Sequence, residues 1–133
     1  PGDPLGFQQG IGREPLGLQE ESDRGPSPRD PYCREGFPDG MTRDSEGYLW
    51  IAHWAGGCIS KRCPASGERL ARIPTHAYQT SACCFGGPEL IDLYFTSAQV
   101  DLTESQQATF PQSGHLFKKT LETPGSPTFP YRG

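Results

Sequence analysis

The chain has 133 residues with 12 basic and 16 acidic side chains, a net charge of −4 at pH 7 and a pI near 5.3. This balance gives no electrostatic reason to expect a nucleic-acid partner. Apolar runs are far shorter than a membrane span and the start does not resemble a signal peptide, so we expect a cytoplasmic protein with no membrane partner. Five cysteines, among them the adjacent Cys83 and Cys84, favour reduced thiols.

The first segment, residues 1–36, contains 13 Pro plus Gly and shows no alternation of apolar and polar residues. This composition is typical of disordered sequence, and we expect an irregular, poorly packed segment. Three explanations stay open: genuine disorder, a shifted reading frame or wrong gene boundary, and a divergent copy of the repeat described below.

Short strands separated by Gly, Pro and Ser are predicted after residue 36. They cover residues 40–43, 48–54, 58–63, 68–74, 79–85, 93–98 and 115–120. The polar stretch 101–112 reads as a loop with one helical turn capped by Thr103. The first four strands would form one sheet and the last three a second. Because that second sheet lacks a fourth strand, we expect an unpaired edge that favours self-association.

The second strands of the two sheets are copies of one another. The sequence LWIAH at 49–53 recurs as LYFTS at 93–97, a period of 44 residues. Periods of about 40 to 50 residues built from short strands are typical of β-propeller blades. We therefore expect four apolar side chains of these strands to be buried, namely Leu49, Ile51, Leu93 and Phe95. We also expect Trp50 and Tyr94 to occupy equivalent places in the two sheets.

Seven short motifs carry a family resemblance across residues 36–133: FPDGMT, DSEGYLWIAHWAGG, GERLARIP, QTSACCFGG, DLYFTSA, SGHLF and PGSPTFPYRG. In this order they resemble the C-terminal part of the senescence-marker protein, gluconolactonase and regucalcin family. The resemblance implies a six-bladed β-propeller with a divalent-cation site in its channel, used by many members to hydrolyse sugar lactones. Six blades of about 45 residues need roughly twice this chain. We therefore expect a fragment, all-β, with about two C-terminal blades over residues 37–133.

Asp39 is the candidate for chemistry. On pattern alone, Pro38-Asp39-Gly40 is a favourable β-turn sequence, and a turn aspartate is the simpler interpretation. The resemblance implies instead a metal ligand at the channel end of an inner strand, where hard cations prefer carboxylate oxygens. In that role Asp39 is also a candidate general base toward the attacking water.

The partners of Asp39 implied by the family are a glutamate near the N-terminus and an asparagine near mid-chain. Neither has a recognisable counterpart, and Glu14, Glu20 and Glu21 match no family motif. A single carboxylate binds divalent ions weakly. We therefore expect binding of calcium, zinc or manganese to be weak or absent, and the chain to be inactive alone.

Other candidate groups have simpler interpretations. Asp44 and Glu46 flank a turn that reads as an exposed hairpin rather than an acid–base pair. Cys58 and Cys63 lack the second Cys or His pair that a zinc site needs. His53, beside two tryptophans in a strand, is expected to line the core or the channel.

Three functions remain open. The first is part of a metal-dependent sugar-lactone hydrolase, with a sugar lactone as its small-molecule partner. The second is a calcium-binding regulatory propeller without turnover, as regucalcin-like members imply. The third is a truncated product without activity, which an upstream reading frame encoding a Glu-bearing blade would exclude.

Overall fold

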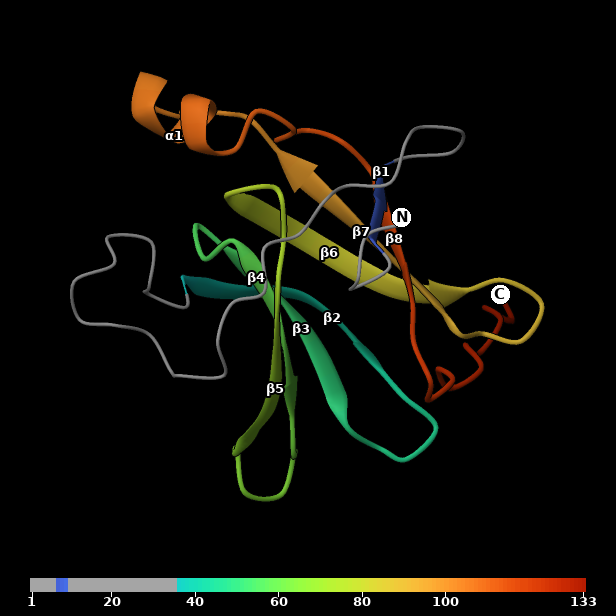
Figure 1. The fold of residues 1–133 in the computed structure, drawn as a ribbon. Helices are drawn as coiled ribbons and strands as arrows, with labels where there is room; N and C mark the ends of the chain where they lie inside the picture. Colours follow the sequence, from blue (N-terminus) through green and yellow to red (C-terminus); the bar gives the residue numbers. More distant parts are fainter. Residues whose placement is uncertain (1–6, 10–35) are drawn as a thin grey trace.

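The computed structural model describes the backbone of residues 7–9 and the whole of residues 36–133. The elements in chain order are β1 (Phe7–Gln9), β2 (Phe37–Arg43), β3 (Leu49–Trp54), β4 (Cys58–Arg62), β5 (Arg69–Pro74), β6 (Gln79–Gly86), β7 (Asp92–Ala98), α1 (Glu104–Thr109) and β8 (Phe117–Thr120) (Figure 1). In this part of the chain no helix is long and apolar enough to cross a membrane. The expected irregularity of the N-terminal segment concerns residues that lie largely outside the described ones.

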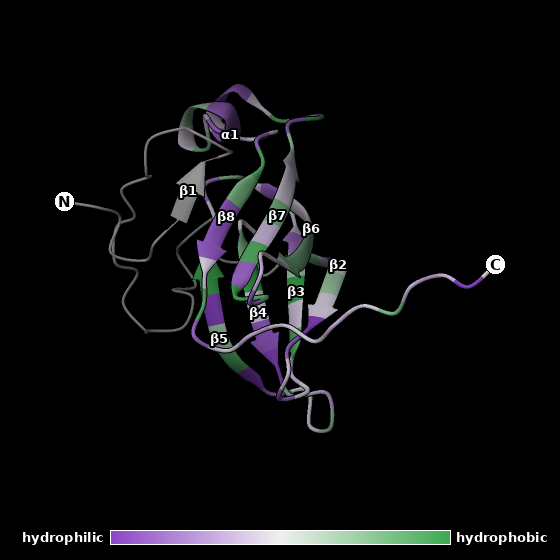
Figure 2. Cartoon of the chain, turned by 90° about the vertical axis from the view of Figure 1, so that its right-hand side faces the viewer, coloured by the Kyte–Doolittle hydropathy of each residue, from purple (hydrophilic) through white to green (hydrophobic). Residues whose placement is uncertain are grey.

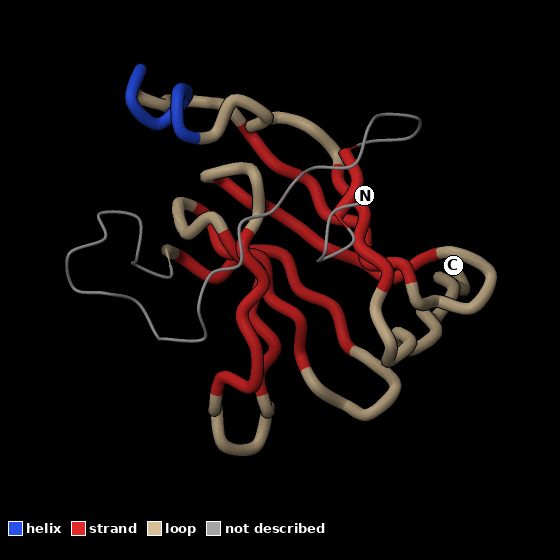
Figure 3. The backbone as a smooth tube through the Cα atoms, viewed as in Figure 1, coloured by secondary structure: helices blue, strands red, loops and turns tan. Residues whose placement is uncertain are grey.

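The strands form two four-stranded antiparallel sheets. The first sheet has the order β2-β3-β4-β5 and the second the order β1-β8-β7-β6. Figure 3 shows strands throughout both sheets and the short helix at one end of the second. The prediction of an all-β chain is confirmed, and its seven strands all form, because Gly, Pro and Ser mark the turns between short runs of β-forming residues.

The expectation of an unpaired edge on the second sheet was wrong. Strand β1 pairs antiparallel with β8, with Phe7 opposite Lys119 and Gln9 opposite Phe117. The Pro/Gly-rich segment thus supplies the fourth strand of the sheet that the C-terminal residues build (Figure 1). Strand β8 therefore does not offer the free edge on which the expected self-association depended.

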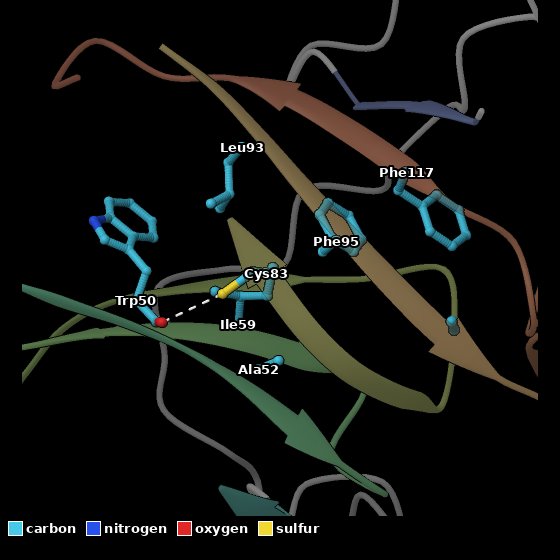
Figure 4. Packing of buried hydrophobic residues seen from close by; sticks show 8 residues of the cluster. Trp50, Ala52, Ile59, Cys83, Leu93, Phe95 and Phe117 are labelled. Atoms are coloured by element: carbon cyan, nitrogen blue, oxygen red, sulfur yellow. Dashed lines mark hydrogen bonds between the residues drawn. The ribbon is translucent and has the colours of Figure 1, made fainter. Parts of the chain in front are cut away.

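The core lies between the two sheets (Figure 4). It is built by buried side chains from both sheets and from the connection between them, namely Trp50, Ala52, Ile59, Ala77, Cys83, Leu93, Phe95 and Phe117. The rings of Phe95 and Phe117 stack with centroids 5.1 Å apart, and Trp50 meets Phe85 edge-on at 6.2 Å. Burying each large side chain contributes roughly 1.5–3 kcal/mol, so this interface holds the sheets together.

The predicted burial is confirmed for Ile51, Leu93 and Phe95, whereas Leu49 is only half-buried. Trp50 in β3 and Tyr94 in β7 do occupy equivalent positions. Each lies between a residue of the first strand of its blade, β2 or β6, and a lysine of the third, β4 or β8. Their environments differ. Trp50 belongs to the core, while Tyr94 lies on the other face of its sheet from Phe95 and is half-buried.

The helical turn predicted in the polar stretch is confirmed as α1. Thr103 caps it, and its side chain accepts a hydrogen bond from the Gln106 N–H at 3.2 Å. The Gln106 side chain accepts one in return from the Thr103 N–H at 3.0 Å. This reciprocal capping box satisfies two N–H groups that a short helix leaves open.

Candidate functional site

Asp39 lies within β2 and not in a tight turn, so the turn interpretation of Pro38-Asp39-Gly40 was wrong. The register of β2 against β3 shifts between Pro38 and Met41, which makes Asp39 and Gly40 a β-bulge. Bulges occur next to functional sites because they redirect a side chain out of the regular pleat. The Asp39 side chain is exposed, so its carboxylate is available to a ligand.

The bulge packs directly against β6, the inner strand of the second sheet. A Cβ atom at Gly40 would lie 2.7 Å from the Cα of Ala82 and 2.9 Å from the carbonyl oxygen of Ser81. Only glycine permits this approach of two backbones. Gly40 therefore brings the inner strands of the two sheets together and places Asp39 beside the start of β6.

Cys83 fixes the same contact from the other side. Its thiol donates to the carbonyl oxygen of Trp50 at 3.3 Å (Figure 4). Burial raises the pKa of the Cys83 thiol to about 12, and the neighbouring Cys84 raises it as well. Since the thiolate is the form that binds metals and attacks electrophiles, Cys83 has a packing role beneath the bulge.

Metal-binding side chains do not gather around Asp39 in the described part of the chain. Residues 36–133 contain no group of three or more His, Cys, Asp or Glu side chains that could hold a metal ion. Glu14, Glu20 and Glu21 lie outside the described residues. The described residues therefore supply one carboxylate, which fits part of a cation site and does not complete one.

The expectation that Asp44 lies in an exposed turn was wrong, because its side chain is fully buried. The Oδ1 atom accepts from the N–H groups of Glu46 and Tyr48 at 3.0 and 2.9 Å. The Oδ2 atom accepts from the Trp50 indole at 2.9 Å and lies 3.5 Å from the Lys61 ammonium. Asp44 thus organises the β2–β3 hairpin and is not a catalytic acid or base. The sequence signal for this buried role was a turn aspartate placed six residues before a tryptophan that can donate to it.

The hairpin also holds the C-terminal segment. Ser45 donates to the Pro124 carbonyl at 2.8 Å, and the Ser126 hydroxyl donates to the Asp44 carbonyl at 2.7 Å. Beyond this attachment the chain runs away from the sheets (Figure 2), with Phe129 97% and Tyr131 94% exposed. The last of the family motifs is therefore anchored at its start only.

The remaining histidine and cysteine candidates do not form a site with Asp39. His53 is buried, as expected, and its Nε2 lies 2.7 Å from the Ser60 hydroxyl. Cys58 is buried, whereas Cys63 is partly exposed in the β4–β5 turn. A hydrogen bond from the Ser66 side chain lowers the pKa of the Cys63 thiol.

Known proteins are similar in sequence to most of this chain. The profile of the SMP-30/Gluconolactonase/LRE-like region matches residues 19–99. The chain belongs to this family. The match begins inside the Pro/Gly-rich segment, earlier than residue 36 where the motifs had placed it, and it stops before α1 and β8.

Two curated relatives illustrate the similarity. Regucalcin from Danio rerio is 41% identical over 100 residues, which cover 74% of this chain and 34% of the relative. The pentonolactonase XacC from Haloferax volcanii is 38% identical over 98 residues, which cover 71% of this chain and 33% of the relative. The chain thus spans about a third of the length of these relatives.

A solved structure supports the fold. Regucalcin from Agrobacterium tumefaciens, described as a calcium-binding protein, superposes with a TM-score of 0.63 at 31% identity. The match covers 70% of this chain and 31% of that protein. The two sheets therefore have the arrangement found in regucalcin-like propeller proteins.

Proposed function

We propose that Asp39 is a metal ligand and proton acceptor in a sugar-lactone hydrolase of this family, and that this chain contributes one carboxylate to that site. The observation that carries the proposal is the exposed position of Asp39 in the bulge of β2, within the Pro-Asp-Gly motif. The similarity to a pentonolactonase supports sugar lactones as the substrate class.

The chemistry follows from the carboxylate and its support. An ionised carboxylate is an acceptor only, so Asp39 can hold a cation or take the proton of a water molecule. A divalent cation bound there would polarise the ring-ester carbonyl. The packing of Gly40 against Ala82 fixes the backbone beside Asp39. A carboxylate presented from a fixed strand loses less freedom when it positions water.

The site of this chain alone is incomplete in our proposal. One carboxylate must replace several waters on a divalent ion with little chelation in return. We expect weak binding of calcium, zinc or manganese, and lactone hydrolysis no faster than background.

A second candidate function is calcium binding without turnover. The observation that favours it is the description of the Agrobacterium regucalcin as a calcium-binding protein. A third candidate is a product with no activity, in which Asp39 binds nothing. The three differ in what Asp39 does when metal and lactone are supplied together.

The experiment combines metal titration by calorimetry with lactonase rates in the presence and absence of chelator, using the whole chain. Asp39→Asn removes the charge while keeping the shape. Asp101→Asn is the matched control, because Asp101 is exposed, lies outside β2 in the turn after β7 and has a positive φ that asparagine tolerates.

We expect millimolar metal binding that Asp39→Asn weakens and Asp101→Asn does not. Equal binding by the wild-type chain and Asp39→Asn would contradict the ligand role. Tight binding with chelator-sensitive turnover, lost in Asp39→Asn, would show that the site of this chain is complete. Calcium binding without turnover in a longer form of the protein would favour the second candidate.

A further inference from the structure

Both sheets have a register shift at the corresponding place, between Pro38 and Met41 in β2 and between Thr80 and Ala82 in β6. Equivalent residues of β3 and β7 lie 44 positions apart. In the first sheet, His53 pairs with Pro38 and Ile51 with Met41. In the second sheet, the equivalent Ser97 pairs with Thr80 and Phe95 with Cys83. Between these pairs, β2 contains Asp39 and Gly40, and β6 contains Ser81 and Ala82. Ser81 therefore holds in β6 the position that Asp39 holds in β2.

The two bulges also touch. The nearest atoms to a Cβ placed on Gly40 belong to Ala82 and to the carbonyl of Ser81, all within 2.9 Å. Asp39 directly precedes Gly40 in β2, and Ser81 itself supplies the carbonyl oxygen in this contact, so the two equivalent positions are neighbours across it. The repeat thus brings two equivalent backbone positions that carry different side chains, an aspartate and a serine, next to one another.

Ser81 forms a hydroxyl pair with Thr96, with 2.8 Å between Oγ and Oγ1. One of the two hydroxyl hydrogens is shared within the pair, which leaves the other hydrogen and further lone pairs for a ligand. The position equivalent to Thr96 in the first sheet is Ala52, a buried core residue without a hydroxyl. The hydroxyl pair is therefore not a by-product of the repeat.

We propose that Ser81 and Thr96 bind the ring hydroxyls of a sugar lactone beside Asp39. This inference rests on the function proposed above and names a specificity-determining pair for it. Neutral hydroxyls are weaker ligands than carboxylates for divalent cations, but they both donate and accept hydrogen bonds, as sugar hydroxyls do. The alternative role is a cross-strand pair that only stabilises the second sheet.

The test compares two ring esters by amide NMR on the whole chain, in strongly buffered solution. D-glucono-1,5-lactone carries ring hydroxyls, whereas δ-valerolactone has the same ring ester without them. We expect the sugar lactone to bind more tightly and to shift the Ser81 and Thr96 amides. The double variant Ser81→Ala/Thr96→Val should lower its affinity about tenfold, to the level of δ-valerolactone, as loss of neutral hydrogen bonds predicts.

Two further variants separate recognition from stability. Ser81→Thr keeps a hydroxyl and should retain the preference for the sugar lactone. Thr128→Val removes a hydroxyl from the exposed C-terminal segment and should change neither affinity. Far-UV circular dichroism should show the same fold in all variants, since Ser81 is half-buried and Thr96 is exposed.

The inference is overturned if the wild-type chain binds both esters alike or not at all, or if the double variant keeps the preference. A separate measurement addresses the metal proposal, namely Mn²⁺ relaxation enhancement at the Gly40 and Met41 amides and its loss in Asp39→Asn. Absence of this enhancement with persistent hydroxyl-dependent lactone binding would contradict the metal role and support the hydroxyl pair.

Discussion

Replacing Asp44 tests whether the β2–β3 hairpin depends on a buried carboxylate. In Asp44→Ala, the N–H groups of Glu46 and Tyr48 and the buried Trp50 indole lose their acceptor, and Lys61 loses an ion-pair partner. An unsatisfied buried donor costs about 1–3 kcal/mol, and water can reach the two partly buried N–H groups. We therefore expect the free energy of unfolding to fall by about 3–4 kcal/mol.

Asp44→Asn should be milder. The amide oxygen can still accept the two backbone N–H groups, but the amide nitrogen then faces two donors, the Trp50 indole and the Lys61 ammonium. We expect a loss of about 2 kcal/mol, between the wild-type chain and Asp44→Ala.

The assay is thermal and urea unfolding followed by circular dichroism and tryptophan fluorescence. For a folded domain of about 100 residues, a loss of about 3–4 kcal/mol in the free energy of unfolding corresponds to a decrease in Tm of roughly 12–30 °C. Glu46→Gln is the control, because Glu46 is exposed and its carboxylate lies 3.8 Å from the Lys61 ammonium, a surface contact worth about 0–1 kcal/mol. A loss below about 1 kcal/mol in Asp44→Ala would refute the reasoning.

Three further predictions concern the thiols and the contact between the sheets. Iodoacetamide should modify Cys63 before Cys84 in the native chain, since hydrogen bonds lower the pKa of the Cys63 thiol, and should spare buried Cys83; mass spectrometry of the digested protein checks this order. Stability should decrease above about pH 9, because Cys83 stays protonated in the folded state up to a pKa of about 12 while the unfolded thiol ionises. In urea titrations from pH 8 to 11, Cys83→Ala should make this decrease shallower by up to about 1.4 kcal/mol per pH unit, and parallel profiles would contradict the assignment. Gly40→Ala should destabilise the chain by about 1–3 kcal/mol in the same assay, because the new Cβ meets the backbone of β6, and an unchanged Tm would show that the inner strands can separate at no cost.

The strands of residues 36–133 could be predicted because local signals and tertiary structure agree there. Glycine, proline and serine mark each turn, and the copied second strands fix the relation between the sheets. The predicted helical turn likewise needed only Thr103 and Gln106, which cap each other within four residues. Local chemistry suffices where the partners of a group are close in sequence.

The misses share a physical cause, which is a partner distant in sequence. Strand β1 has three residues, too few for an alternation to be visible, and its pairing with β8 arises only when the two ends of the chain meet. Asp44 was assigned to solvent because its turn is polar, whereas Lys61 and the C-terminal segment bury it. Leu49 is half-buried although Leu93, its copy, is fully buried, because the core lies on opposite faces of β3 and β7.

The motif predicted Asp39 as the candidate site residue, but it did not predict the backbone geometry around it. The sequence pattern alone favoured a turn, since Pro-Asp-Gly has the same composition in a turn and in a bulge. The deciding residue is Gly40, whose missing side chain allows β6 to approach and keeps the segment in the strand. That contact depends on Ala82, forty-two positions further on, and no local pattern reports it.

The fold and the proposed function depend on different residues in this chain. The core side chains and the Asp44 network hold the two sheets and the hairpin, and most of them lie between the sheets. Asp39 is exposed, and its side chain is outside this core, so the fold does not require an aspartate at that position. Similarity over residues 19–99 therefore establishes the family, while the proposed activity would depend on how many carboxylate and amide ligands meet Asp39 in one site. For this reason the Asp39→Asn titration, and not a measurement of stability, tests the proposed function.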